Sequence, residues 1–187
     1  MRAAVTRVIA AALAAGGTSL AVYTAVNPIF EGRRTNAYLD IVGIPTICEG
    51  WTHGVRLGDI ATPAQCDEYA RKAFADAWNV WVQWAPEHVR AGMEPVNEAA
   101  FLLFITNVGA GRVAKGGDPG KDGFVWLKSG RHSTMLRLLQ AGDVAGACAQ
   151  FRHWANAGGK PSRGLAIRRG DETGMCRWPA TTGVVSP

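Results

Sequence analysis

Hydrophobic residues recur with helical spacing over the middle and the end of this chain. Thr62-Pro63-Ala64-Gln65 is a capping box with proline at the first helical position, which predicts a helix from residue 63 to about Trp84. Its apolar side chains share one face, which predicts core packing rather than a platform for sugars: Phe74, Trp78, Trp81 and Val82.

A second, more apolar helix is predicted from Pro95 to about Val108, with the composition of a central core element. Shorter helices are predicted over residues 134–140, 144–154 and 162–175, and a loop from Pro179 onward. The glycine-rich stretch 115–123 lacks the Gly-Lys-Ser/Thr ending of a phosphate-binding loop, so a surface loop is predicted there.

Residues 27–60 change from a helical pattern to a strand pattern. Asn27-Pro28 has the residues of a helix start, because asparagine caps well and proline is tolerated at the first helical position. This helix is expected to fade near Asp40, since glycine and proline soon follow. Thr46-Ile47-Cys48 then predicts a short strand, within a β-hairpin near residues 41–60.

The N-terminal segment is apolar enough to suggest a membrane span. Arg2 and Arg7 are followed by 23 uncharged residues before Glu31. At about 1.5 Å per residue, a helix over residues 8–26 would reach roughly 30 Å, the thickness of a hydrocarbon core. Seven of its 19 residues are alanine and Gly16-Gly17 interrupts it, so its insertion is expected to be marginal.

Candidate chemistry lies directly after this segment. Glu31, Asp40 and Thr46 are spaced by nine and then six positions. Two carboxyls across a cleft suit cleavage of a glycosidic bond, because one donates a proton to the leaving oxygen while the other stays ionised to orient water. On spacing alone, the alternative is a solvated Glu and Asp flanking a turn.

The run resembles the active-site pattern of the phage-type lysozymes (glycoside hydrolase family 24), which is Glu, eight residues, Asp or Cys, five residues, Thr. Similarity continues to about residue 178 through several further segments: Asn107-Val108-Gly109-Ala110-Gly111, Ser133-Thr134, Gly146-Ala147-Cys148, Trp154, Ala157-Gly158-Gly159-Lys160, Gly164-Leu165 and Arg168-Arg169. Residues 112–131 look like an insertion relative to the family.

The resemblance implies a bilobed, mostly helical α+β fold with a small β-hairpin lobe, a long bridging helix and a helical lobe. It implies hydrolysis of the β-1,4 bond between N-acetylmuramic acid and N-acetylglucosamine in peptidoglycan, with inversion. Glu31 would be the general acid, Asp40 the ionised partner that positions water, and Thr46 a ligand of that water. Arg163 or Arg168 would hold Glu31 in place. No cofactor or metal is expected.

The N-terminal span resembles the signal-anchor-release segments of lambdoid endolysins. We therefore expect residues 1–27 to be a releasable anchor and residues 28–187 the catalytic domain. The span would lie in the host inner membrane with its N-terminus in the cytoplasm. Release into the periplasm would depend on a phage holin or pinholin, and the protein would be a monomer. Cleavage as a signal peptide and permanent anchorage remain alternatives, although no clean Ala-x-Ala site follows the span.

Charge and cysteine content add two expectations. The net charge of +5 is scattered without a basic block, which argues against nucleic acid and suits a polyanionic surface such as murein. Four cysteines beyond a membrane predict disulfides, and three pairings are possible. Cys48–Cys66 and Cys148–Cys176 are favoured because each joins neighbours within one lobe. His53 is expected to line the surface or the substrate rather than bind a metal.

Two rival functions remain open at this stage. A lytic transglycosylase would use one catalytic Glu and form an anhydro sugar, and Asp40 and Thr46 at the family spacing argue against it. A non-catalytic, membrane-tethered murein-binding protein is the second rival, and the intact triplet argues against loss of activity.

Overall fold

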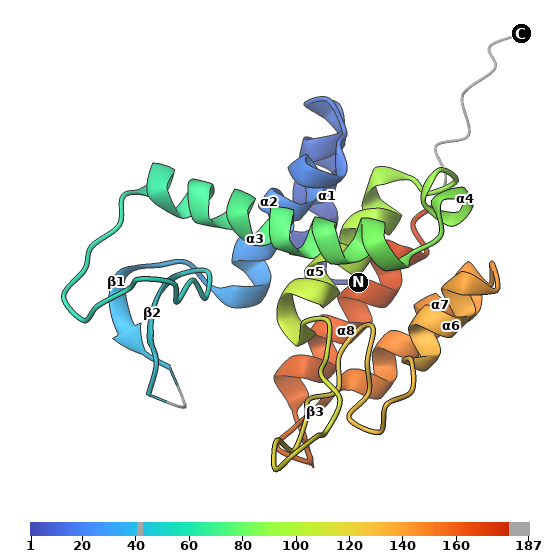
Figure 1. Ribbon diagram of the computed structural model, residues 1–187. Coiled ribbons are helices and arrows are strands. Elements are labelled where there is room, and N and C mark those ends of the chain that lie inside the picture. Colours follow the sequence, from blue (N-terminus) through green and yellow to red (C-terminus); the bar gives the residue numbers. More distant parts are fainter. Residues whose placement is uncertain (41–42, 180–187) are drawn as a thin grey trace, which may run out of the picture.

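The computed structural model describes residues 1–40 and 43–179 of the chain. Figure 1 shows two lobes joined by the long helix α3 (Pro63–Trp84), which crosses from the small lobe to the helical lobe. The small lobe holds strands β1 (Arg34–Leu39) and β2 (Pro45–Cys48). The helical lobe is built around α5 (Pro95–Val108), against which α2 (Ser19–Glu31), α3 and α8 (Arg163–Cys176) pack. The expected bilobed α+β arrangement is confirmed.

Helices α3 and α5 form where the sequence predicts them. The Thr62 hydroxyl accepts a hydrogen bond from the Gln65 amide at 3.2 Å, and Gln65 Oε1 accepts one from the Thr62 amide at 2.7 Å. This reciprocal capping satisfies two amides that would otherwise lack partners. Helix α5 is apolar through its middle and is buried there; its buried residues are Val96 and Ala99 through Ile105.

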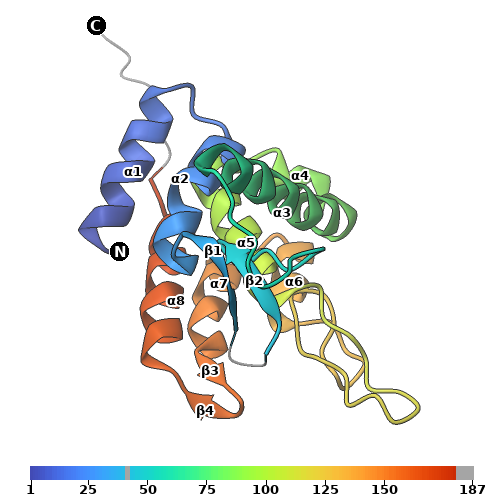
Figure 2. The same cartoon turned by 90° about the vertical axis from the view of Figure 1, so that its left-hand side faces the viewer.

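The N-terminal segment is part of the same core. It forms α1 (Ala3–Ala14) and α2 (Ser19–Glu31), and Figure 2 shows α1 lying beside α2. The single helix expected over residues 8–26 is therefore not what this structure shows. The chain reverses at Gly16 and Gly17, whose φ angles of +118° and +57° lie where side chains are disfavoured. No helix among residues 1–40 and 43–179 is long and apolar enough to cross a membrane.

The helix start predicted at Asn27-Pro28 is wrong. Helix α2 begins at Ser19, where the Thr18 hydroxyl accepts a hydrogen bond from the Ala21 amide at 3.1 Å. Proline inside a helix costs about 3 kcal/mol. That cost is outweighed because upstream side chains of α2 become fully buried, each contributing roughly 1.5–3 kcal/mol; they are Val22, Tyr23 and Val26.

The helical pattern expected to continue to Asp40 is also wrong. Gly32 ends α2 with a φ of +72°, and β1 follows almost at once. Strands β1 and β2 pair antiparallel with Tyr38 opposite Thr46, so the hairpin starts earlier than the predicted range of 41–60. The strand predicted at Thr46-Ile47-Cys48 is confirmed.

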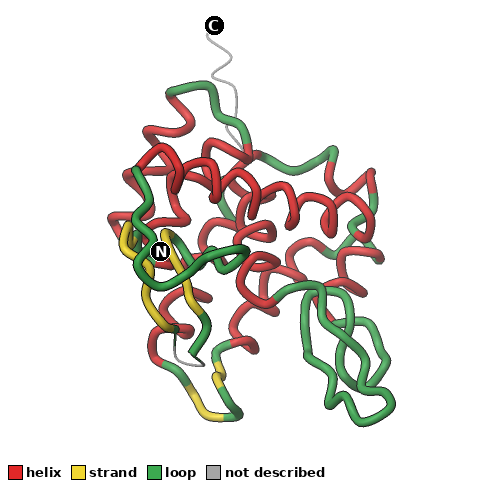
Figure 3. Tube along the Cα trace, turned by 60° about the vertical axis from the view of Figure 1, so that its left-hand side comes forward, coloured by secondary structure: helices red, strands yellow, loops and turns green. Residues whose placement is uncertain are grey.

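The rest of the helical lobe contains α4 (Glu87–Arg90), α6 (Thr134–Gln140), α7 (Val144–Gln150) and the short 3-10 turn η1 (Phe151–Trp154). This lobe is not wholly helical, because β3 (Asn156–Ala157) pairs with β4 (Lys160–Pro161). Residues 112–131 form a loop that projects from the lobe (Figures 2 and 3), and it includes the surface loop predicted at 115–123.

Both favoured disulfides are present. Cys48–Cys66 ties β2 to α3, and Cys148–Cys176 ties α7 to α8. The second bridge fastens the helix that carries Arg168 to the rest of the helical lobe. Its two cysteines are 28 positions apart, so the bridge restricts a sizeable loop in the unfolded chain.

Removing this bridge should therefore lower stability. Cys148→Ala/Cys176→Ala is expected to reduce the free energy of unfolding by about 2–4 kcal/mol, mainly because the unfolded chain gains entropy. Urea unfolding of oxidised wild type and of the double variant measures the difference. Equal midpoints and slopes would show that the bridge adds nothing.

Candidate active site

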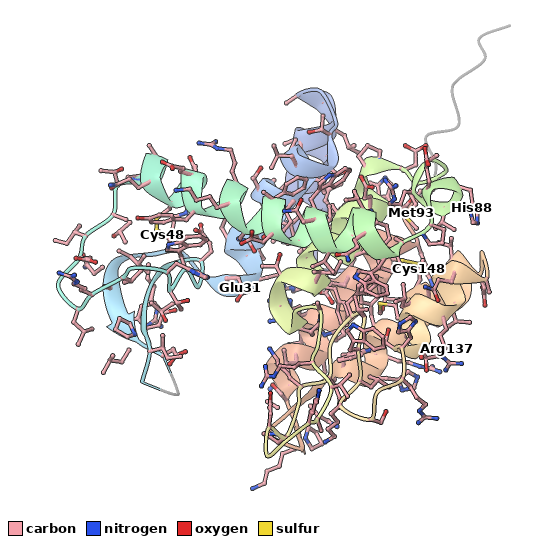
Figure 4. The ribbon with its side chains drawn as sticks, in the orientation of Figure 1. Glu31, Cys48, His88, Met93, Arg137 and Cys148 are labelled. Carbon is pink, nitrogen blue, oxygen red and sulfur yellow. A yellow bond between two sulfur atoms is a disulfide. The ribbon has the colours of Figure 1, made fainter. Side chains whose placement is uncertain are left out.

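Glu31 ends α2 and lies between the two lobes (Figure 4). Its side chain is 23% exposed, and the Nη1 of Arg168 on α8 donates a hydrogen bond to Glu31 Oε1. Of the two basic residues predicted to hold this carboxyl, Arg168 contacts it. Arg163 is exposed at the start of α8. Glu31 is thus fixed from a helix 137 positions away in the sequence.

Arg168 is itself held on all sides. Its Nε donates to Glu172 Oε1 at 2.9 Å, its Nη2 donates to the Leu103 carbonyl at 3.0 Å, and its Cζ lies 4.9 Å from the centre of the Phe30 ring. Burial acts to lower the pKa of Arg168, but the charges of Glu31 and Glu172 outweigh it and raise the pKa. The guanidinium therefore stays charged and rigid beside Glu31.

Glu172, the partner of Arg168, is itself held by further buried contacts. Glu172 is fully buried, and its other oxygen accepts a hydrogen bond from Arg169, which also donates to Asn107 Oδ1. Burial raises the pKa of Glu172 even though both arginines act to lower it. Sequence reasoning gave Glu172 no role. The available signal was its spacing of three and four positions from the two arginines, which a helix brings into contact.

Asp40 and Thr46 both bond to the backbone of one hairpin residue, Ile44. Asp40 Oδ1 accepts a hydrogen bond from the Ile44 amide at 2.9 Å, and the Thr46 hydroxyl donates to the Ile44 carbonyl at 2.9 Å. The Asp40 amide also bonds the Ile44 carbonyl at 3.0 Å. Thr46 is buried, whereas Asp40 is half-buried. The structure therefore brings these two predicted residues together on the small lobe, while Glu31 is anchored from the helical lobe.

A groove of about 280 Å³ runs beneath α3 between the lobes. The small lobe contributes Trp51 and His53 to it, and α5 with the residues after it contributes Thr106 and Ala110. Trp51 stacks on Tyr69 with ring centres 5.1 Å apart, which gives the groove one flat aromatic wall. His53 lines the groove, as expected. A second cavity, of about 390 Å³, lies under the 112–131 loop. Glu31, Asp40 and Thr46 line neither the groove nor this cavity.

One group of potential metal ligands occurs in residues 1–40 and 43–179, namely Cys48, Glu49 and Cys66. The two sulfur atoms are bonded to each other, so they cannot serve as thiolate ligands. Glu49 instead pairs with Arg33.

Two lobes joined by a long helix, with the hairpin in the smaller one, form a lysozyme-like fold. A family model described as phage lysozyme matches residues 28–172, so the chain belongs to the phage lysozyme family.

The chain is similar to SAR-endolysins of two Enterobacteria phages, PA-2 and P21. Each is 32% identical over 177 residues, which cover 92% of this chain and 94% of the relative. Among solved structures, the active form of the P1 phage endolysin Lyz gives a TM-score of 0.68 at 22% identity, covering 92% of this chain and 93% of that one. A P22 lysozyme variant gives 0.62 at 24% identity, covering 82% and 93%. These structural likenesses concern the fold.

Proposed function

We propose that this protein is an endolysin that hydrolyses the β-1,4 bond between N-acetylmuramic acid and N-acetylglucosamine in host peptidoglycan, and so lyses the cell. The observation that carries the proposal is the placement of Glu31 between the lobes, fixed by Arg168, at the family spacing from Asp40 and Thr46. The groove beneath α3 suits an extended glycan.

In this proposal Glu31 first binds a proton on the oxygen that Arg168 does not contact, and then transfers it to the leaving glycosidic oxygen. The Thr46 hydroxyl already donates a hydrogen bond to the Ile44 carbonyl. Its oxygen can therefore only accept a hydrogen bond from the attacking water. Asp40 stays ionised and takes the other proton as the water attacks the sugar carbon, with the Ile44 amide fixing one of its oxygens. This role for Asp40 as base corresponds to the inverting mechanism.

Two substitutions of Asp40 test its role. Asp40→Asn is expected to lose activity by about 10²-fold or more, because an amide cannot take the proton from water. Asp40→Cys should lose less, since a thiolate can act as base and the family pattern admits cysteine. Rates of murein clearing at matched concentrations of folded protein measure both. Wild-type activity in Asp40→Asn would make Asp40 a structural residue of the turn.

The alternative reaction is that of a lytic transglycosylase, in which the sugar's own hydroxyl attacks and an anhydro product forms. The hydrogen bonds that fix Asp40 and Thr46 on the backbone of Ile44 favour a positioned water instead. A murein-binding protein without turnover would have no need of Glu31 in an ion pair between the lobes.

We also propose that residues 1–27 first anchor the protein in the inner membrane and then leave it, so that the folded form belongs to the periplasm. The packing of α1 and α2 supports this, because Val5, Ile9 and Tyr23 complete the core. Arg2 supports it too: its backbone N–H and its Nε donate to the two oxygens of Asp171 at 2.6 and 2.5 Å. Since α2 carries both Tyr23 and Glu31, a segment still in the bilayer would leave Glu31 without its supporting core.

Substitution of the two glycines in the turn between α1 and α2 tests whether the segment leaves the membrane. Gly16→Leu/Gly17→Leu is expected to keep more protein in the membrane fraction and to delay lysis. Leucine favours the bilayer by about 0.5 kcal/mol per residue. It also strains a turn that needs positive φ at both positions. Fractionation of induced cells with timed lysis measures the effect.

The control is Ala10→Leu/Ala14→Leu, which changes two exposed positions of α1 and leaves the turn intact. We expect it to retain the protein in the membrane less strongly than the glycine pair does. Release and lysis of the glycine variant at the wild-type rate would rule out this mechanism and favour cleavage of the segment.

A further inference from the structure

A small cavity of about 60 Å³ adjoins the groove beneath α3. Trp51, Ala73 and Thr106 line both the cavity and the groove, so the cavity lies at the edge of the groove. Asn27, which also lines it, stands four positions before Glu31 on α2 and therefore on the same face of that helix. The cavity is thus one helical turn from the proposed general acid.

Two buried oxygen atoms belong to side chains that line this cavity. Asn27 Oδ1 and Glu49 Oε2 are the buried side-chain oxygens without a hydrogen-bond partner among the residues that the structure describes. Asn27 is 1% exposed and the Glu49 side chain is 3% exposed, with Glu49 Oε1 already bonded to Arg33. A buried polar group left unpaired costs about 1–3 kcal/mol. These two groups therefore suit a ligand that bears hydrogen-bonding atoms.

The remaining wall of the cavity is mostly apolar. Ala70 and Ala73 present methyl groups from α3, and Trp51 and Tyr69, whose rings are stacked, also line the cavity. Arg33 already neutralises the charge of Glu49, so the cavity has no need of a bound cation. Its volume admits a substituent of a few heavy atoms but no sugar ring. A group with one donor, one acceptor and a methyl matches these walls.

We propose that this cavity binds the 2-acetamido group of the sugar next to the scissile bond, an inference that rests on the proposed muramidase function. The acetamido N–H donates to Glu49 Oε2, and its methyl packs on Ala70 and Ala73. Asn27 donates a hydrogen bond to the acetamido carbonyl oxygen. It can do so because a 180° rotation of its terminal amide places the donor Nδ2 where Oδ1 lies. Glu49 and Asn27 are then residues that determine specificity.

The size of the cavity gives the first test, which uses murein that has been de-N-acetylated and then N-propionylated. The extra methylene should not fit, so wild-type kcat/KM is expected to be at least tenfold lower than on N-acetylated murein. Ala73→Gly enlarges the cavity and should reduce that ratio to about threefold or less. Ala75→Gly is the matched control, because it is an exposed position of the same helix and should keep the wild-type ratio.

The second test concerns the acceptor. With Arg33 bound to one oxygen, Glu49→Gln turns an amide NH₂ toward the cavity in place of Oε2. KM on N-acetylated murein should rise about tenfold with kcat nearly unchanged. Asp67→Asn is the control, because Asp67 is the other carboxylate bound to Arg33 and does not line the cavity.

Each failure has a separate signature. If wild type cleaves no glycosidic bond in N-acetylated murein, the proposed function fails. If it cleaves N-acetylated and N-propionylated murein equally well, the function stands and the acetamido site is overturned. The site is also overturned if Ala73→Gly and Ala75→Gly behave alike, or if Asp67→Asn raises KM as much as Glu49→Gln, which would reduce Glu49 to a support for Arg33.

Discussion

Glu31→Gln is expected to abolish murein hydrolysis while the protein remains folded. General acid catalysis contributes about 10²–10⁴-fold, and an amide has no proton to transfer to the leaving oxygen. The substitution should not disturb the fold, because the glutamine oxygen can still accept the hydrogen bond from Arg168. Turbidity loss of a murein suspension measures activity, and circular dichroism with thermal unfolding measures folding.

Glu87→Gln provides the control for this experiment, since Glu87 is exposed on α4 and should keep full activity. Substantial hydrolysis by well-folded Glu31→Gln protein would remove Glu31 from the role of acid.

Arg168→Met is expected to have the largest effect on stability. Methionine keeps much of the apolar part of the arginine side chain. The fully buried Glu172 would then have Arg169 as its one ionic partner. Glu31 would lose its ion pair with Arg168. Breaking a buried ion pair by removing one member destabilises by about 3–5 kcal/mol. Activity should fall as well, because Glu31 loses the group that positions it.

Urea unfolding of Arg168→Met is best compared with Arg163→Met. Arg163 stands five positions earlier on the same helix but is exposed, and such surface changes are usually within about 0.5 kcal/mol of wild type. Equal stability of the two variants would mean that the Arg168–Glu172 pair does not hold α8 in place.

Local rules predicted the elements whose signals are complete within a few residues. The capping box at Thr62–Gln65 predicted the start of α3, and the apolar run from Ala99 to Ile105 predicted that α5 is a core helix. The two disulfides followed from lobes that the family resemblance outlined. The hairpin strand at Thr46 was likewise local, because proline and glycine bracket it.

The misplaced helix start at Asn27-Pro28 has a tertiary cause. Both residues suit a cap, but Val22 and Tyr23 upstream gain more from burial against α5 than proline loses inside α2. No window of sequence reveals that an apolar N-terminal segment will fold back onto a core. The sequence therefore predicted one apolar span where the folded protein has α1 and α2.

The sequence proposed residues for the candidate site but gave few of their contacts. The family pattern singled out Glu31, Asp40 and Thr46 as candidates, whereas the contact of the buried Glu172 with Arg168 depends on the packing of α8 against α5. The small cavity of about 60 Å³ could not be predicted from the sequence. Asn27 and Glu49 come from α2 and from the turn after β2, and only the fold places both around one small space.

The chemistry of the product ends tests the central claim most directly. Purified murein is digested with the full-length protein, reduced with borohydride and analysed by mass spectrometry. The account predicts fragments that end in reduced N-acetylmuramic acid, as hydrolysis of the β-1,4 bond requires. Fragments that end in a 1,6-anhydro sugar, which borohydride cannot reduce, would show transglycosylation and contradict the assigned roles of Asp40 and Thr46.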